Sequence, residues 1–149
     1  MSHHLTKLMA ADTPDTSERM DIRVYYEDTD TGGVVYYANY LKFFERARTE
    51  WLRRLGVNQS ELAAREQRIF VVKDVELHYR QPARLDDLLV IHSDIMRVGP
   101  ASIRFRQRAM RDGELLCEGS IQVCCIDAAS FRPAPFSTDL RTLLEKAKN

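Results

Sequence analysis

The sequence predicts an α+β fold in which an antiparallel β-sheet wraps around one long central α-helix, and three observations support it. Apolar residues recur at helical spacing between Ala38 and Leu55. Beyond residue 70 the apolar period changes to two, over segments long enough to be strands. The turn signals Gly99-Pro100 and Asp112-Gly113 separate these segments, and strands joined by tight turns run antiparallel.

Two elements precede these strands. A half-buried strand is expected over Ile22–Glu27, because apolar and polar side chains alternate there until Gly32-Gly33 breaks the pattern. The long helix then covers Ala38 to Leu55, and its polar face is expected to form the ion pairs Glu45–Arg48 and Glu50–Arg54. The apolar stripe of this helix is too wide for a helix at the protein's edge, so we expect the helix to cross the face of the sheet. The stripe consists of Tyr40, Phe43, Phe44, Ala47, Trp51, Leu52 and Leu55.

The rest of the chain is expected to form a short helix, four strands and a closing helix. The short helix covers Gln59–Glu66, and Asn58 or Ser60 would cap its N-terminus. The later elements are the strands Val71–Arg80, Leu88–Val98, Ser102–Arg111 and Leu115–Asp127, and the helix Asp139–Lys146.

Length and composition predict one soluble domain. The chain has 149 residues, enough for a core without disulfides or metal, and we expect a mobile extension over residues 1–20 and a single domain over residues 21–149. A formal net charge of zero argues against nucleic-acid binding. No apolar run approaches the roughly 20 residues of a membrane-spanning helix. The odd number of cysteines (Cys117, Cys124 and Cys125) indicates buried, reduced thiols in a cytoplasmic protein.

The acidic run from Glu27 to Gly33 is the main candidate for chemistry, and three interpretations were weighed. A calcium loop opening at Asp28 would need glutamate at its twelfth position, where Asn39 stands, so this interpretation is rejected. A solvated turn with a helix cap is the structural alternative. The third interpretation is catalytic, because the run places a carboxylate beside the N-terminus of the long helix, where N–H groups are unpaired and the helix dipole favours negative charge.

This catalytic arrangement suits thioester hydrolysis. A carboxylate can activate water as a general base or attack as a nucleophile, while helix N–H groups hold the developing oxyanion. Sequence signatures of a serine nucleophile elbow, a zinc protease and a phosphate-binding loop are absent. His78 and His92 fall on predicted strands and are expected to have surface or packing roles, and a cysteine–histidine nucleophile pair is a minor alternative.

The run RVYYEDTDTGGVVYYANYLKFFERARTEWLRRLG, residues 23–56, resembles the signature of the 4-hydroxybenzoyl-CoA thioesterase family. It is most similar to the Tol-Pal-associated acyl-CoA thioesterases of Gram-negative bacteria, which the run FVVKDVELHYRQPARLDD, residues 70–87, also resembles. The resemblance implies a hotdog fold and a cytoplasmic enzyme that hydrolyses acyl-CoA without a metal or cofactor. It further implies a homodimer or homotetramer, with acyl carrier protein as a candidate partner.

The resemblance also assigns roles to individual residues. It places the catalytic carboxylate on Asp30, a site-lining side chain on Tyr26, and the carbonyl-polarising backbone N–H on Tyr37, where the closer relatives often have histidine. Contacts with the substrate and CoA are implied for Gly33, Val34 and Arg97. Alternatives to Arg97 are Arg104, Arg106 and Arg108, which could equally form a solvated strand face. The alternative function is a non-catalytic scaffold that binds acyl groups or acyl carrier protein and links lipid metabolism to the envelope.

Overall fold

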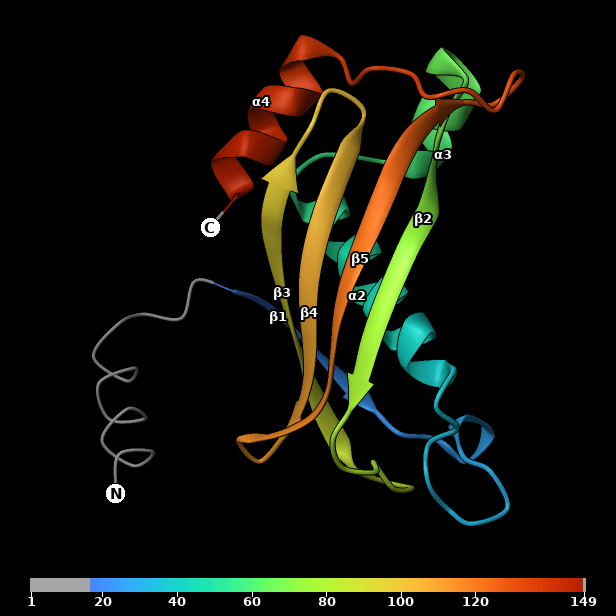
Figure 1. Cartoon of the computed structure of the whole chain (residues 1–149), viewed down its shortest axis with the longest axis vertical. Coiled ribbons are helices and arrows are strands. Elements are labelled where there is room, and N and C mark those ends of the chain that lie inside the picture. The colour runs from blue at the N-terminus through green and yellow to red at the C-terminus, as the bar shows by residue number, and fades with distance from the viewer. Residues whose placement is uncertain (1–16, 149) are drawn as a thin grey trace.

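The computed structural model describes residues 17–148. Five antiparallel strands form one sheet in the order β1-β3-β4-β5-β2, and helix α2 (Asn39–Arg54) crosses one face of it diagonally (Figure 1). Helix α4 (Thr138–Ala147) lies at the end of the sheet near the β3–β4 turn. The strands are β1 (Glu18–Arg23), β2 (Arg68–Tyr79), β3 (Leu88–Val98), β4 (Ser102–Arg111) and β5 (Glu114–Asp127).

The core lies between α2 and the sheet. Phe43 and Phe44 of α2 are fully buried, and they belong to one apolar cluster with Ile91, Phe105 and Ile121 of the central strands. Alternate residues of each central strand face the helix, as a two-residue period requires. The predicted α+β fold, with a wide apolar stripe crossing the sheet, is therefore confirmed, and α2 is one residue shorter at each end than predicted.

The first strand differs from its prediction. Strand β1 begins at Glu18 and ends at Arg23, instead of covering Ile22–Glu27. It pairs with β3 from Glu18 opposite Ser93 to Arg23 opposite Leu88, and it ends there because β3 begins at Leu88. The last three residues of the predicted extension, 18–20, therefore belong to the sheet, while residues 1–16 lie outside the described residues.

The segment after α2 is only partly α-helical. Helix α3 (Gln59–Glu61) continues as a π-helical turn, η2 (Leu62–Glu66), which ends at Gln67, a residue with a φ of 55°. The predicted cap is confirmed, because the Asn58 side chain accepts a hydrogen bond from the Glu61 N–H at 3.1 Å. Strand β2 then begins at Arg68, three residues earlier than predicted, and forms one edge of the sheet.

Arg48 corrects the prediction for the polar face of α2. Only 7% of Arg48 is exposed, and its Nη1 donates a hydrogen bond to Oε1 of Gln107 on β4 at 2.9 Å. Neither predicted ion pair forms: Glu50 pairs with Arg53, and Arg54 pairs with Glu18 on β1. The Glu45–Arg48 prediction failed because helical spacing gives no information on the buried amide of Gln107, which the sheet presents to this part of α2.

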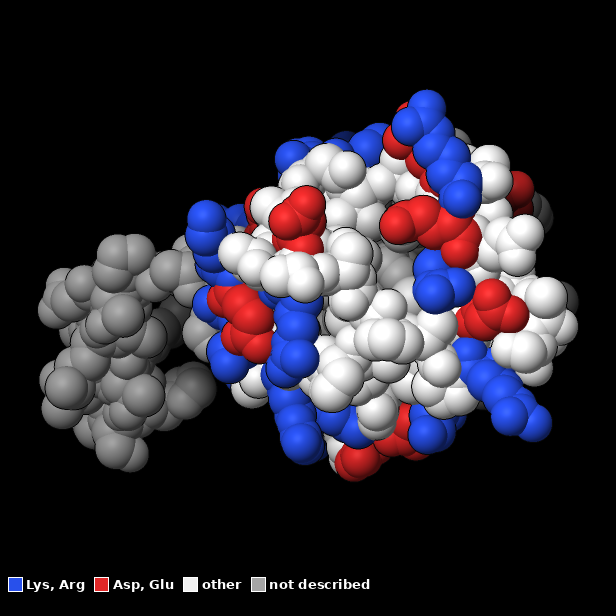
Figure 2. Space-filling model, turned by 90° about the horizontal axis from the view of Figure 1, so that it is seen from above, with Lys and Arg blue, Asp and Glu red and all other residues white. Residues whose placement is uncertain are grey.

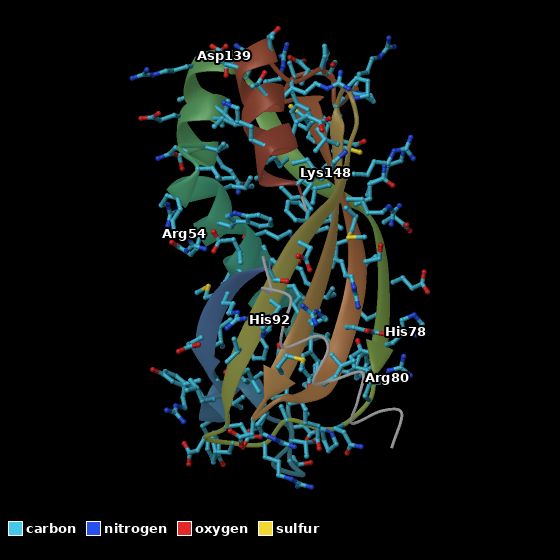
Figure 3. The ribbon with its side chains drawn as sticks, turned by 90° about the vertical axis from the view of Figure 1, so that its left-hand side faces the viewer. Arg54, His78, Arg80, His92, Asp139 and Lys148 are labelled. Atoms are coloured by element: carbon cyan, nitrogen blue, oxygen red, sulfur yellow. The ribbon has the colours of Figure 1, made fainter. Side chains whose placement is uncertain are left out.

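The cysteines and histidines lie as expected. All three cysteines are buried and free, and burial raises the pKa of Cys117 to about 12, which keeps its thiol protonated and inert. Figure 3 shows His78 on β2 and His92 on β3, and two strands separate β2 from β3. His78 is exposed and bonds to Glu76.

One end of the molecule carries charges of both signs. Figure 2 shows the end of the molecule that carries α4, where basic and acidic side chains are interspersed around a largely uncharged centre. Within residues 17–148, no helix is both long enough and apolar enough to cross a membrane.

Candidate active site

The acidic run lies in the connection between β1 and α2, and Asp28 holds this connection together. The Asp28 side chain is buried, and its carboxylate accepts a hydrogen bond from the Tyr25 N–H at 2.9 Å. Its backbone carbonyl accepts hydrogen bonds from the Tyr36 N–H at 3.1 Å and from the Asn39 side-chain amide at 2.8 Å. Asp28 is thus a structural residue that ties the start of the run to the start of the helix.

Asp30, in contrast, is exposed and is the first residue of a tight turn. The Asp30 N–H donates to the Val34 carbonyl at 2.9 Å, and the Gly33 N–H donates to the Asp30 carbonyl at 3.0 Å. Gly33 has a φ of +77°, which favours glycine. The Gly32 N–H holds Oδ1 of Asp30 at 2.8 Å, whereas Oδ2 accepts no hydrogen bond from any residue in the described part of the chain. One carboxylate oxygen is therefore oriented by the turn and the other is available.

The loop between β2 and β3 supports this turn from the side. The Val35 N–H donates to the Ala83 carbonyl at 2.8 Å, and the Leu85 N–H donates to the Gly33 carbonyl at 3.3 Å. The Ala83 N–H in turn donates to the Tyr40 hydroxyl at 3.2 Å. The Asp30 turn is thus bonded to a loop that is itself bonded to α2.

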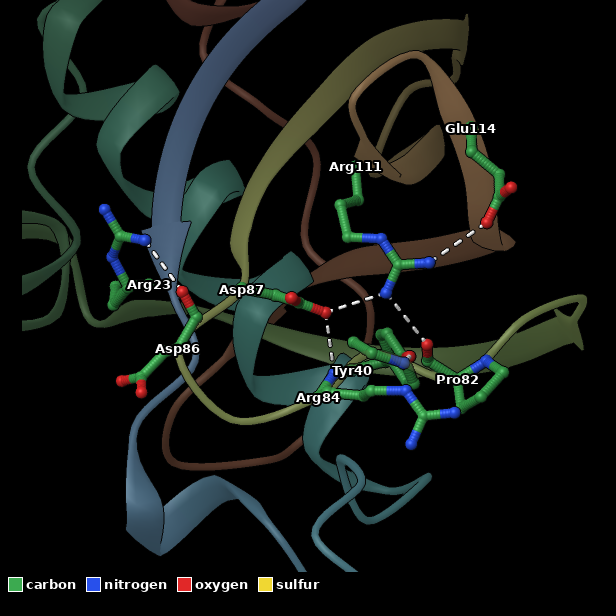
Figure 4. A network of polar contacts seen from close by, with 9 residues as sticks. Arg23, Tyr40, Pro82, Arg84, Asp86, Asp87, Arg111 and Glu114 are labelled. Atoms are coloured by element: carbon green, nitrogen blue, oxygen red, sulfur yellow. Dashed lines mark hydrogen bonds and ion pairs between the residues drawn. The ribbon is translucent and has the colours of Figure 1, made fainter.

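An ion-pair network braces the same loop (Figure 4). Arg111 donates through Nη1 to Asp87 at 2.7 Å and to the Pro82 carbonyl at 3.2 Å, and through Nη2 to Glu114 at 3.1 Å. Asp87 also accepts a hydrogen bond from the Arg84 N–H at 2.8 Å. Partial burial acts to raise the pKa of Asp87, but the bonds from Arg111 and Arg84 outweigh it and lower this pKa below 3.8. The carboxylate is therefore charged at neutral pH.

The start of α2 supplies free donors at the end of the connection that carries Asp30. The N–H groups of Asn39, Tyr40 and Leu41 already donate to the carbonyls three residues before them, at 2.8, 3.4 and 3.2 Å. The two preceding N–H groups, those of Tyr37 and Ala38, donate to no acceptor among residues 17–148. Unpaired N–H groups at a helix N-terminus carry a partial positive charge and bind anions. They can therefore stabilise a carbonyl oxygen that becomes negatively charged.

The predicted site residues separate into two groups. Asp30, Gly33, Val34 and Tyr37 lie together on the β1–α2 connection, and Tyr26 lies earlier in it with 81% of its surface exposed. Arg97 lies near the far end of β3. Leu88, at the other end of β3, pairs with Arg23 next to the connection. Arg97 lies nine residue steps along the strand from Leu88, or roughly 30 Å, so one chain does not bring Arg97 to Asp30.

Two residues near the turn were not singled out from the sequence. Tyr79, the last residue of β2, donates its hydroxyl to the Tyr37 carbonyl at 3.2 Å. Arg84 pairs with Val34 in an isolated bridge. The two-residue period placed Tyr79 on the apolar side of its strand, but no sequence signal links it with Tyr37, which is 42 residues away. Within the described residues, no group of three or more His, Cys, Asp or Glu side chains could hold a metal ion.

Comparison with known proteins agrees with this architecture. Residues 24–144 match the family model of the thioesterase-like superfamily, and the chain belongs to this family of hotdog-fold proteins. It is 44% identical over 127 residues to the acyl-CoA thioesterase YbgC of Haemophilus influenzae, covering 85% of this chain and 93% of that protein. It is 46% identical over 116 residues to the acyl-CoA thioester hydrolase YbgC of Escherichia coli, covering 77% and 86%.

The solved structures include a near neighbour of the same kind. The crystal structure of a probable thioesterase from Bartonella henselae superposes with a TM-score of 0.77 at 35% identity, covering 81% of this chain and 99% of that one. A DHNA-CoA thioesterase from Staphylococcus aureus superposes with a TM-score of 0.82 at 22% identity, covering 87% and 89%, a likeness of fold alone.

Proposed function

We propose that this protein is an acyl-CoA thioesterase, which hydrolyses the thioester of acyl-CoA to a carboxylic acid and CoA. One observation carries the proposal: an exposed carboxylate with a free oxygen, Asp30, belongs to the same connection as the free N–H groups at the start of α2. Relatives that are 44% and 46% identical bear thioesterase names, and this supports the proposal.

Asp30 provides the chemistry through its free oxygen. As a general base, Oδ2 takes a proton from water while the water oxygen attacks the thioester carbon. As a nucleophile, it attacks that carbon itself and forms an anhydride that water then hydrolyses. In both routes the C–S bond breaks, and the CoA sulfur leaves as a thiolate that takes up a proton. The Tyr37 N–H holds the developing oxyanion, and such a donor is typically worth about 10²–10³ in rate.

The active form is proposed to contain at least two chains, as a homodimer or homotetramer. Strand β2 is a 12-residue edge of the sheet, and Val72 and Val75 on it are 49% and 38% exposed. A second chain that pairs along β2 would cover these side chains and lie beside Tyr79, which contacts Tyr37. If the two β2 strands pair in antiparallel fashion, the β3–β4 turn of the second chain lies toward the end of the sheet that carries Asp30. This places a second Arg97 at that end.

The test is thiol release from acyl-CoAs of graded chain length and from an aromatic acyl-CoA. We expect Asp30→Asn to lower kcat by at least about 10²-fold, because an amide can act neither as base nor as nucleophile. Asp112→Asn, which makes the same chemical change at the exposed β4–β5 turn, should retain the wild-type rate. Full activity of Asp30→Asn would refute the site assignment.

The same assay decides between the enzyme and the scaffold. If the wild type binds acyl-CoA in a calorimeter but releases no thiol from any substrate, the non-catalytic acyl-binding function replaces the enzyme. Binding of acyl carrier protein, measured with its acylated and free forms, tests the same scaffold function.

A further inference from the structure

We infer that Tyr79 is a positioning residue for this reaction: its hydroxyl fixes the Ala38 N–H, which forms a pair of oxyanion donors with the Tyr37 N–H. This inference rests on the proposed thioesterase function. It adds a second donor, Ala38, and the residue that holds this donor in place, and the family resemblance assigned a role to neither of them.

The hydroxyl of Tyr79 is placed by contacts on two sides. The Tyr79 ring packs edge-on against Tyr37, with centroids 6.0 Å apart and an interplanar angle of 79°. It also packs against Tyr40, at 5.8 Å and 53°. Between these contacts, the hydroxyl donates to the Tyr37 carbonyl at 3.2 Å. Partial burial raises the pKa of Tyr79, with smaller contributions from Cys117 and Tyr37, so the hydroxyl keeps its proton at neutral pH.

The planarity of the peptide bond links this hydrogen bond to the donors. The Tyr37 carbonyl and the Ala38 N–H belong to one planar peptide group and point in opposite directions. Fixing the carbonyl oxygen therefore aims the N–H away from it. The only other hydrogen bond to this carbonyl from the described residues is a long one, from the Tyr40 N–H at 3.4 Å. Tyr79 is thus the better-placed anchor of this peptide group.

The neighbouring peptide group has an anchor of its own. It carries the Tyr37 N–H, and its carbonyl, that of Tyr36, accepts a bond from the Asn39 N–H at 2.8 Å. Two successive peptide groups are thus held by their carbonyls and leave both N–H groups free. A hydrogen bond at a carbonyl also polarises its peptide group and strengthens the N–H as a donor. The Tyr79 hydroxyl therefore orients and activates the Ala38 N–H.

The kinetic test is Tyr79→Phe, which removes the hydroxyl and keeps the ring. We expect kcat to fall about 5- to 30-fold, less than the loss of a complete oxyanion donor, while KM and the melting temperature stay unchanged. The matched control is Tyr25→Phe. Tyr25 is 62% exposed, and its hydroxyl bonds to no residue in the part of the chain that the structure describes. This control should keep the wild-type kcat.

A spectroscopic test separates positioning from a merely structural role. In the Asp30→Asn background, which keeps bound substrate intact, the carbonyl stretch of a ¹³C-labelled acyl-CoA should shift to lower frequency on binding. Adding Tyr79→Phe should remove part of this shift. If the wild type is active but Tyr79→Phe changes neither kcat nor the shift, the inference is wrong while the proposed function stands. A lower kcat with an unchanged shift also overturns it. If the wild type releases no thiol, the proposed function itself fails.

Discussion

At the scale of single residues, Arg48 is a buried cation whose hydrogen-bond partner is an uncharged amide. Its guanidinium bonds to Gln107 and lies 5.9 Å from the centre of the Phe105 ring. Desolvation lowers the pKa of Arg48 to about 10, although Glu45 opposes this, so the charge persists at neutral pH. The Gln107 amide is itself fixed by bonds to the Phe44 carbonyl and the Ser93 hydroxyl, both at 2.9 Å. Gln107 therefore presents its oxygen to Arg48 and links α2 to the sheet.

This arrangement makes the amide more important for stability than the cation. Gln107→Leu leaves Arg48 charged and without its partner, and we expect it to lower the free energy of unfolding by about 3–5 kcal/mol. Arg48→Met leaves only the neutral side-chain oxygen of Gln107 unpaired and should lower the free energy of unfolding by about 1–3 kcal/mol. The double variant should lose less free energy of unfolding than the two single variants lose together. Urea unfolding of all four proteins measures this coupling, and additive effects would contradict it.

The choice of Asp30 over Asp28 shows what the sequence could predict about the site. The glycine break, the acidic run and the following helix predicted a carboxylate near a helix N-terminus, and in the structure the acidic run lies on the connection that leads into α2. Residue spacing alone could not separate the two aspartates, and the family resemblance selected Asp30. The structure gives the physical difference: Asp28 is buried and bonded to Tyr25, whereas Asp30 is exposed. The catalytic role of Asp30 remains a prediction.

At the scale of elements, the loop of residues 80–87 holds the Asp30 turn in place, and its own shape depends on Asp87. The carboxylate joins the Arg84 N–H to Arg111 of β4, while the loop backbone bonds to Gly33 and Val35. The sequence predicted only the strands on either side of this loop, Val71–Arg80 and Leu88–Val98. It could not predict the ion pair between Asp87 and Arg111, because Arg111 lies 24 residues beyond Asp87 and the two meet only when β4 pairs with β3.

The contacts of Asp87 with Arg111 and with the Arg84 N–H predict that the protein loses stability in acid. The pKa of Asp87 is lower in the folded chain than its usual 3.8. The ionised carboxylate therefore contributes fully to the stability of the fold at pH values above 3.8. This contribution is lost as the pH falls through the folded pKa. Asp87→Asn should therefore destabilise the protein at about pH 6, and its difference from wild type should shrink as the pH falls below 3.8. Thermal unfolding over this range measures the difference, and a gap that does not depend on pH would contradict the prediction.

At the scale of the whole molecule, most of the architecture follows from local patterns. The wide stripe on α2 and the period of two predicted a helix lying on an antiparallel sheet, and both are observed. The errors arise where pairing between distant segments decides the structure. Strand β1 ends where β3 begins, and Arg48 is buried because Gln107 lies opposite it. Sequence periodicity also could not predict that β2 would be an edge strand.

The unpaired edge of β2 gives the last prediction, because one strand carries both the proposed subunit contact and Tyr79. Val72 is 49% exposed in one chain, so lysine fits there, but a pair of chains would bury the charge. We expect the wild type to have at least twice the 17.3 kDa mass of one chain, and Val72→Lys to have the mass of a single chain. Its thiol-release activity should fall more than about 10-fold, because the carbonyl-polarising N–H groups would lose the neighbouring subunit that covers them.

Light scattering and thiol release on the same samples measure both quantities. Leu143→Lys is the matched control, because Leu143 is also an apolar side chain, 38% exposed, but lies on α4, away from β2. This control should keep both mass and rate. A single-chain variant with full activity would show that one chain completes the site by itself. If the wild type has the mass of one chain, the proposed oligomer is refuted. The Asp30 and Tyr79 tests then apply to a monomer.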